Sequence, residues 1–159
     1  MQQIQKATFG AGCFWGVEAA FGQLRGVQST SVGYMGGHFA NPGYLDVLSR
    51  ITGHAEVVQV DYDPQQISYR ELLAVFWQIH DPTSLNRQGA DRGEQYRSVI
   101  FYHTSEQAAI ARQSKHQLQA SGQYNQPIVT QIAPASDYWL ATAEHQQYFA
   151  KQKSRQKAE

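Results

Sequence analysis

The sequence predicts an α+β domain, a two-layer α/β plait in which helices cover one face of a sheet. The predicted elements follow the order β-α-β, β-α-β and then α-β-α. Two strands adjoin without an intervening helix, which disfavours a doubly wound parallel sheet. A length of 159 residues with 42% hydrophobic content suits one globular domain. We therefore expect residues 1–159 to form a single domain around a ferredoxin-like β-α-β-β-α-β core, with long loops and an additional C-terminal helix.

The first β-α-β unit follows from glycine positions and apolar spacing. Residues 4–9 read as a strand, and the turn Gly10-Ala11-Gly12 separates them from a predicted helix that ends near Gly26. The apolar stripe of this helix consists of Phe14, Val17, Phe21 and Leu24. Residues 27–34 form the next predicted strand, and the glycine-rich, aromatic stretch 33–44 is expected to be a loop.

The second unit begins with an alternating pattern at residues 55–62, which predicts a strand. This pattern places Glu56 on one face with Val58, Val60 and Tyr62. The sequence Ser68-x-x-Glu71 is a capping box, and it opens a predicted helix that stops before Pro82.

The rest of the chain supplies the last expected elements. Residues 80–95 are polar and glycine-punctuated, so we expect a loop. Residues 97–103 predict a strand that is apolar on both faces and therefore central in the sheet. The remaining expected segments are a helix at 104–120, a strand at 128–133, a helix at 142–153 and a flexible tail at about 151–159.

Charge and hydropathy exclude several classes of target. Thirteen basic residues balance thirteen acidic ones, and the pI is about 7.0, so no overall field attracts nucleic acid or anionic lipid. No apolar run reaches the roughly 18 to 20 residues of a membrane span, and the N-terminal residues lack the apolar core of a signal peptide. We expect a cytoplasmic monomer that binds neither nucleic acid nor membrane.

The chain has one cysteine, Cys13, so it can form neither an internal disulfide nor a zinc site of several thiolates. Cys13 follows a predicted strand and a glycine turn and begins a predicted helix. Free backbone amides there favour a thiolate, and we expect them to lower the pKa of the thiol. Phe14 and Trp15 could wall an apolar pocket beside it. The alternative is that all three side chains pack inside the protein.

Three further residues could carry acid or hydrogen-bonding chemistry. Glu56 shares a strand face with valines, so burial would raise its pKa and make it a proton donor near neutrality. Alternatively, Glu56 turns out into solvent at the start of its strand. Tyr44 and Tyr96 lie in or beside irregular loops, where their phenols could donate hydrogen bonds or simply pack at an interface.

Metal and nucleotide sites receive little support from the sequence. The six histidines include His38, His54 and His80, but none forms a helical metal-binding pair. The cluster Gly33-x-x-Gly36-Gly37 is not followed by a phosphate-binding helix. We expect no bound metal and no bound organic cofactor.

The pentapeptide Gly12-Cys13-Phe14-Trp15-Gly16 resembles the active-site signature of the peptide methionine sulfoxide reductase A family. Other blocks resemble the same family in order and spacing, and together they extend from about Lys6 to Tyr148. They are Gly33-Tyr34-Met35-Gly36-Gly37, Asn41-Pro42-Gly43-Tyr44, Thr52-Gly53-His54-Ala55-Glu56-Val57-Val58, Tyr62-Asp63-Pro64, His80-Asp81-Pro82-Thr83, Asn86-Arg87-Gln88-Gly89-Ala90-Asp91-Arg92-Gly93, Gln95-Tyr96-Arg97-Ser98 and Ala143-Glu144-His145-Gln146-Gln147-Tyr148.

The resemblance implies a two-layer α/β plait and a catalytic domain that reduces the S epimer of methionine sulfoxide, free or in peptides and proteins. By this resemblance, Cys13 is the nucleophile and Glu56 is the acid that protonates the sulfoxide oxygen. Tyr44 and Tyr96 hold that oxygen, and Asp91 assists the site. The resemblance also assigns the aromatic wall that receives the methyl group on sulfur to Phe14 and Trp15.

The sequence departs from the common family pattern because it has no resolving cysteine. Leu48 stands where some members carry one, and the tail 151–159 contains no thiol. A sequence whose resolving cysteine had been removed would look the same. We expect the sulfenic acid on Cys13 to be reduced by an external thiol, either glutathione followed by glutaredoxin or a thioredoxin.

Three other functions compete with this interpretation. A cysteine hydrolase or acyltransferase would use Cys13 with a base such as His54, and it would need a third orienting group. A non-catalytic module could bind methyl groups in an aromatic pocket, and a redox sensor could use Cys13 as its switch. Neither of the last two functions predicts turnover of a sulfoxide.

Overall fold

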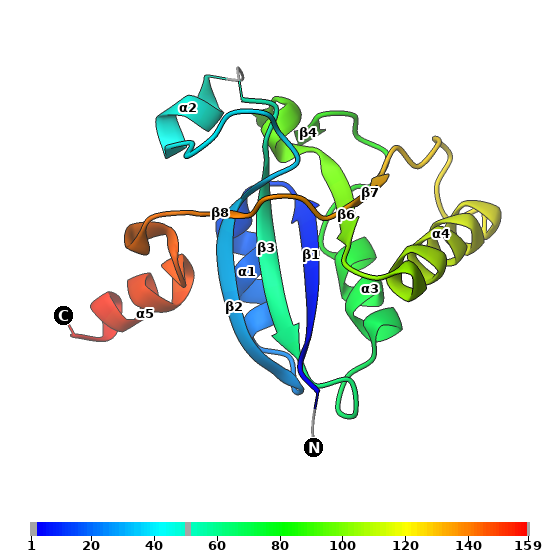
Figure 1. Ribbon diagram of the computed structural model, residues 1–159, viewed down its shortest axis with the longest axis horizontal. Coiled ribbons are helices and arrows are strands. Elements are labelled where there is room, and N and C mark those ends of the chain that lie inside the picture. Colours follow the sequence, from blue (N-terminus) through cyan, green and yellow to red (C-terminus); the bar gives the residue numbers. More distant parts are fainter. Residues whose placement is uncertain (1–2, 50–51, 159) are drawn as a thin grey trace.

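A six-stranded sheet forms the centre of the protein in the computed structural model, which describes residues 3–49 and 52–158 (Figure 1). Residues 1–2, 50–51 and 159 of the predicted domain and tail lie outside the described residues. The strand order is β7-β6-β1-β3-β2-β8, and all pairs are antiparallel except β6 with β7. The strands are β1 Gln5–Ala11, β2 Val27–Met35, β3 Ala55–Tyr62, β6 Ser98–Tyr102, β7 Gln131–Pro134 and β8 Trp139–Leu140.

Helices α1 (Phe14–Gly22) and α3 (Tyr69–Gln78) cover one face of this sheet, and α4 (Ser105–Ala120) packs beside α3 near β6 and β7. Phe9 of β1 is the centre of this core. Its ring stacks on Phe21 at 5.1 Å and on Phe76 at 5.2 Å, and all three side chains are fully buried. No helix among the described residues is both long enough and apolar enough to span a membrane.

The opposite face of the sheet is covered by a length of chain rather than by a helix. The segment between β7 and β8 crosses the sheet from one edge to the other (Figure 1). Its Ala135 and Tyr138 pack against a second, smaller buried cluster. The sheet residues of this cluster are Met35, Ala55, Val57, Val99 and Phe101. The crossing segment therefore covers the face of the sheet that lies opposite α1 and α3.

Several predicted elements are confirmed. Strand β3 has the predicted limits, and Glu56 shares its face with Val58 and Val60. The capping box is formed, since the Ser68 hydroxyl accepts the Glu71 N–H at 3.1 Å and the Glu71 carboxylate accepts the Ser68 N–H at 3.1 Å. Strand β6 is central, with β1 on one side and β7 on the other.

The predicted helix at residues 142–153 is wrong in its first half. The chain instead forms a 3-10 turn, η2 (Ala143–His145), and begins helix α5 (Tyr148–Ala158) after Gln147, which has φ of 50°. The Gln146 side chain bonds the backbone of β2 at Val32, and Gln147 bonds Glu18 through its N–H and its amide. These tertiary hydrogen bonds override helix propensity. The predicted flexibility of the tail stays a prediction.

Both predicted loops contain short ordered elements. Helix α2 (Tyr44–Leu48) begins at the end of the first loop. The second loop contains the two-stranded hairpin of β4 (Arg87–Gln88) and β5 (Asp91–Arg92), followed by the 3-10 turn η1 (Glu94–Tyr96). These elements are too short for a periodic sequence signal.

A series of hydrogen bonds links the end of α3 to β6 and to the segment before β7, and it depends on a neutral histidine. His80 Nδ1 donates to the carbonyl of Phe76 at 2.6 Å, so its Nε2 accepts from the Ser98 hydroxyl at 2.7 Å. Ser98 in turn bonds Thr130 at 2.7 Å. Burial lowers the pKa of His80 from 6.5 to about 4.

We predict that His80 makes the fold sensitive to acid. The unfolded chain protonates His80 near its ordinary pKa of 6.5, whereas the folded protein resists protonation until about pH 4. Stability is therefore full above pH 6.5 and declines as the pH falls toward 4, by on the order of 3 kcal/mol. Denaturant unfolding between pH 7 and 4.5 should show a shallower decline for His80→Gln than for the wild type. The exposed control His116→Asn should follow the wild type, and equal slopes for all three proteins would contradict the prediction.

Candidate active site

Cys13 lies at the junction of β1 and α1, as the sequence predicts. Gly12 adopts φ of 98°, which turns the chain sharply between the strand and the helix. A Cβ at this position would also approach the Gln88 side chain to 3.0 Å. Cys13 is the N-cap residue and is only partly exposed, and α1 begins at Phe14. The turn thus holds the partly exposed Cys13 at the end of the sheet.

Glu56 lies beside this junction with its carboxylate inside the protein. Its exposed fraction is 2%, which rules out the alternative in which it turns into solvent. The carboxylate accepts the backbone N–H of Phe14 at 3.2 Å, so the first turn of α1 is tied to β3 next to Cys13. Burial raises the pKa of Glu56 from 4.5 to about 7, the Phe14 N–H lowers it, and Asp91 raises it further. The predicted shift is therefore confirmed, and Glu56 can hold a proton near neutrality.

The predicted lowering of the Cys13 pKa is wrong. Burial raises the pKa of this thiol from 9.0 to about 11, and the nearby carboxylates of Glu56 and Asp91 raise it further. Backbone N–H groups of Trp15 and Gly16 do favour the thiolate, as a helix N-terminus should, but they do not outweigh desolvation. The thiol in this structure is therefore protonated and weakly reactive at neutral pH.

Tyr44, Tyr96 and Asp91 lie near the same junction, as predicted. Burial is the largest cause that raises the pKa of Tyr44 and the pKa of Tyr96, and the charge of Glu56 is the second largest for both phenols. The pKa of Tyr96 rises to about 12. Cys13 and Asp91 also raise both pKa values. The two phenols consequently stay protonated at physiological pH and can donate hydrogen bonds. Five titratable groups from separate segments thus share one electrostatic environment.

Each of the three loop residues is held by contacts of its own segment. Tyr44 begins α2, whose preceding Gly43 N–H donates to Asp46 at 2.8 Å. Tyr96 ends η1, which the guanidinium of Arg97 ties to the turn before β3 by donating to the carbonyls of Glu94 and Gly53 at 2.9 and 3.1 Å.

Asp91 is held by the β4–β5 hairpin. It pairs with Gln88, whose side chain makes two hydrogen bonds to the backbone of Asp81 and lies over Gly12. The hairpin therefore places an exposed carboxylate close to the Cys13 turn.

An aromatic cluster surrounds the predicted wall residues Phe14 and Trp15. Trp15 stacks on Tyr148 with ring centroids 4.0 Å apart and donates its indole N–H to His145 Nδ1 at 3.1 Å. The His145 ring also lies 4.6 Å from Tyr44 and 5.6 Å from Phe14. Sequence reasoning missed Tyr148 and His145 as members of the site, although both lie in a block that resembles the reductase family.

Tyr34 is a second residue that sequence reasoning missed. It pairs directly with Glu56 across β2 and β3, and its ring centroid lies 5.7 Å from that of Phe14. Its hydroxyl is buried and has no hydrogen-bond partner among the described residues, although an unpaired buried donor costs about 1–3 kcal/mol. Burial, then Glu56 and Tyr44, raise its pKa. Tyr34 therefore presents a neutral hydroxyl to the interior side of the site.

His54 cannot serve as the base that a cysteine hydrolase requires. Its Nδ1 accepts the Gly37 N–H at 3.0 Å, and its Nε2 donates to the Phe39 carbonyl at 2.7 Å. Both ring nitrogens are used to fix the loop after β2, so no lone pair is left to take a proton from Cys13. Within residues 3–49 and 52–158, no three His, Cys, Asp or Glu side chains are grouped to hold a metal.

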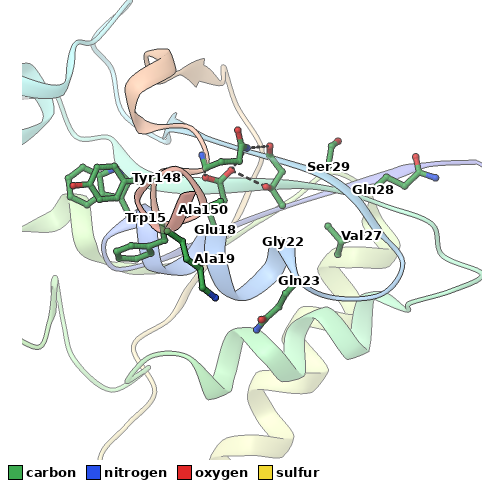
Figure 2. A pocket seen from close by; sticks show the side chains of 14 residues that line it. Trp15, Glu18, Ala19, Gly22, Gln23, Val27, Gln28, Ser29, Tyr148 and Ala150 are labelled. Atoms are coloured by element: carbon green, nitrogen blue, oxygen red, sulfur yellow. Dashed lines mark hydrogen bonds between the residues drawn. The ribbon is translucent and has the colours of Figure 1, made fainter. Parts of the chain in front are cut away.

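A groove of about 560 Å³ lies on the outer side of the aromatic wall, between α1, the edge of β2 and α5 (Figure 2). Trp15 and Tyr148 lie together at one end of it, and Glu18 forms part of its wall. The Glu18 carboxylate is fully engaged by the Thr30 hydroxyl and by Gln147. None of the five titratable groups around Cys13 lines this groove, so it is separate from the reacting groups.

Comparison with known proteins gives one consistent result. Residues 5–159 match the family model described as peptide methionine sulfoxide reductase. The peptide methionine sulfoxide reductase MsrA 1 of Nostoc sp. is 70% identical over 152 residues, which cover 96% of this chain and 93% of the relative.

Two solved structures of yeast Mxr1 share the fold of this chain. The reduced form superimposes with a TM-score of 0.89 at 33% identity, covering 95% of this chain and 87% of the yeast chain. Yeast Mxr1 in complex with Trx2 gives a TM-score of 0.65 at 28% identity, covering 92% and 85% of the two chains.

We predict that alkylation of Cys13 reports the charge on Glu56. The rate with iodoacetamide should be low at pH 7 and still rising above pH 9, because the pKa of the thiol is about 11. Glu56→Gln removes a carboxylate that disfavours the thiolate, so alkylation at pH 8 should be several-fold faster. The matched control Glu144→Gln removes an exposed carboxylate without that effect. A wild-type rate that levels off below pH 8, or no acceleration in Glu56→Gln, would contradict the prediction.

Proposed function

Since this chain belongs to the peptide methionine sulfoxide reductase family, we propose that Cys13 attacks the sulfur of methionine sulfoxide while Glu56 protonates its oxygen. The enzyme reduces methionine sulfoxide to methionine at the expense of thiols. The observation that carries the assignment of residues is the hydrogen bond from the Phe14 N–H to Glu56. It supports the assignment because it holds a carboxyl group with a pKa of about 7 next to Cys13.

The proposed first step transfers oxygen from the substrate to the enzyme. The Cys13 thiolate attacks the sulfoxide sulfur and forms an S–S bond while Glu56 protonates the oxygen. The hydroxyl group then leaves the substrate sulfur and bonds to the Cys13 sulfur as the S–S bond breaks, with its electron pair on the methionine sulfur. The substrate sulfur gains two electrons and the cysteine sulfur loses two, which yields methionine and a sulfenic acid. The sulfoxide oxygen leaves sulfur only when protonated, and this requirement explains why an acid must face the thiol.

Substrate binding must also change the protonation of the site. Without substrate, Cys13 keeps its proton at neutral pH because its pKa is about 11, whereas Glu56, with a pKa of about 7, is only partly protonated there. A sulfoxide presents positive sulfur to the thiol and negative oxygen to the carboxyl. This polarity favours a thiolate beside the sulfur and a protonated acid beside the oxygen. The reactive protonation state therefore forms with the substrate in place, and the resting thiol is protected from unspecific oxidation.

Tyr44, Tyr96 and Asp91 support this step. The two phenols remain protonated and can donate hydrogen bonds to the oxygen as negative charge develops on it. Asp91 contributes a negative charge that helps to keep Glu56 protonated. Trp15, which is partly exposed, supplies an apolar surface for the methyl group on sulfur, and the adjacent Phe14 is fully buried and supports the wall from inside. An oxygen clamp on one side and a methyl pocket on another fix the handedness at sulfur, and we propose selectivity for the S epimer.

Regeneration needs an external thiol because Cys13 is the only cysteine. Leu48 of α2, one turn after Tyr44, is exposed and offers no thiol. A reductant thiol attacks the sulfenic sulfur, releasing water and forming a mixed disulfide, and a second thiol then releases Cys13. The complex of yeast Mxr1 with Trx2 supports a thioredoxin as the partner, and glutathione with glutaredoxin remains the alternative.

We also assign the centre of the fold to the ferredoxin-like plait. In the order β6-β1-β3-β2 each neighbouring pair of strands is antiparallel, and α1 and α3 each connect strands that have one other strand between them. The single-domain organisation, the monomeric state and the cytoplasmic location stay predictions.

The reaction can be tested in a single turnover. Pre-reduced protein is mixed with the separated S and R sulfoxides of N-acetyl-methionine amide without added reductant, and product and intact mass are measured. We expect one equivalent of product from the S epimer only, with a gain of one oxygen, or a trapped sulfenic-acid adduct, on Cys13.

Cys13→Ser should give no product, because a hydroxyl at this position cannot replace the thiolate. Product from the R epimer, activity in Cys13→Ser, or more than one equivalent from the wild type would each contradict the proposal. Addition of a thioredoxin system should restore multiple turnovers.

A further inference from the structure

His145 is the residue on which the aromatic wall converges. It is 7% exposed and comes from η2, remote in sequence from the wall residues that it contacts. The rings of Phe14, Trp15 and Tyr44 all lie within 5.6 Å of its ring, centroid to centroid. One side chain thus joins the first turn of α1 to the start of α2.

The hydrogen bond to Trp15 defines the protonation state of this histidine. An indole N–H can only donate, so His145 Nδ1 must be unprotonated to accept it at 3.1 Å. The neutral imidazole therefore carries its proton on Nε2, which lies 3.9 Å from the Glu144 carboxylate. The Trp15 and His145 rings are inclined by only 19°, so the bond holds the indole edge in a fixed plane.

Tyr148 restrains the same indole in the perpendicular direction. It stacks on the Trp15 face at 4.0 Å with the rings inclined by 12° (Figure 2). Trp15 and Tyr148 both line the groove, so the indole borders open space on that side (Figure 2). Position of the indole therefore depends on the His145 bond as well as on stacking.

We propose that His145 is a positioning residue whose neutral Nε2–H tautomer holds Trp15 in place as a wall of the methyl pocket, and whose protonation on Nδ1 releases the indole and weakens sulfoxide binding. This inference rests on the proposed function of the site. Protonation converts the acceptor into a donor, so two N–H groups face each other and the bond is lost.

The charged and titratable groups around His145 come from every neighbouring element. Glu144 of η2 favours protonation, and burial opposes it more strongly. Lys151 of α5 donates to the Ala143 carbonyl at the start of η2 and adds a positive charge on that side. Tyr44 of α2 contributes a phenol ring that faces His145. Tyr148 of α5 and Tyr34 of β2 contribute phenols that pack on its neighbours Trp15 and Phe14. Helix α1 contributes only the neutral rings of Phe14 and Trp15.

The test follows Trp15 directly, without substrate. In a Trp77→Phe/Trp139→Phe background, Trp15 is the only tryptophan, and its emission is recorded from pH 8 to pH 4.5. We expect the Trp15 emission to change in one step at a pH below 6.5, the ordinary pKa of histidine. This step should disappear in His145→Asn, because asparagine keeps a neutral hydrogen-bond acceptor but does not titrate. The step should persist in His116→Asn, an exposed control on α4. A step that survives His145→Asn, or no step in the parent protein, would overturn the proposal.

A kinetic measurement connects this step to substrate binding. At pH 7.5, His145→Phe should raise KM for N-acetyl-methionine-S-sulfoxide amide by about 3- to 10-fold, which corresponds to the loss of one hydrogen bond, with a smaller change in kcat. In the wild type, KM should rise by a similar factor as the pH falls through the range of the emission step. In His145→Asn, KM should not depend on pH in this way. A wild-type KM that stays constant over this pH range would overturn the proposal. His145→Asn still tests the proposal if His145→Phe does not fold. Absence of any sulfoxide turnover would instead refute the proposed function, and the emission step would be unaffected.

Discussion

A carboxyl group buried beside the first turn of a helix is the constraint on which the site depends. Glu56 accepts the Phe14 N–H, which would otherwise lack a partner at the start of α1, and so the same hydrogen bond caps the helix and fixes the acid. Desolvation raises the pKa of Glu56 to about 7, so this carboxyl group can hold a proton near neutral pH. The hydrogen bond from Phe14 keeps it next to Cys13. Moving Glu56 into solvent would remove both effects.

The rest of the fold maintains this burial on both faces of the sheet. Helices α1 and α3 cover one face, and the segment between β7 and β8 crosses the other (Figure 1). Polar groups then reach the site from short loop elements, each anchored by its own hydrogen bonds, such as those of Arg97 and Gln88. The sheet thus carries the buried carboxyl of Glu56, and the short loops carry the phenols of Tyr44 and Tyr96.

Local sequence patterns predicted the parts of the site that depend on local structure. Alternation along β3 placed Glu56 among valines, and the glycine turn placed Cys13 before a helix. The pKa of Cys13 was predicted in the wrong direction because desolvation and the charges of Glu56 and Asp91 come from distant segments. The start of the last helix was missed because Gln146 and Gln147 bond to β2 and α1 instead. His145 was missed for the same reason, since its role exists only where three segments meet.

Direct titration of the Glu56 carboxyl tests the central claim. Protein labelled with ¹³C at the glutamate side-chain carboxyl is titrated by NMR, and the Glu56 resonance is identified by its loss in Glu56→Gln. The account predicts a midpoint near pH 7 for this one resonance. A Glu56 midpoint near 4.5 would contradict the account, because the acid would then be ionised at neutral pH and unable to protonate the sulfoxide oxygen.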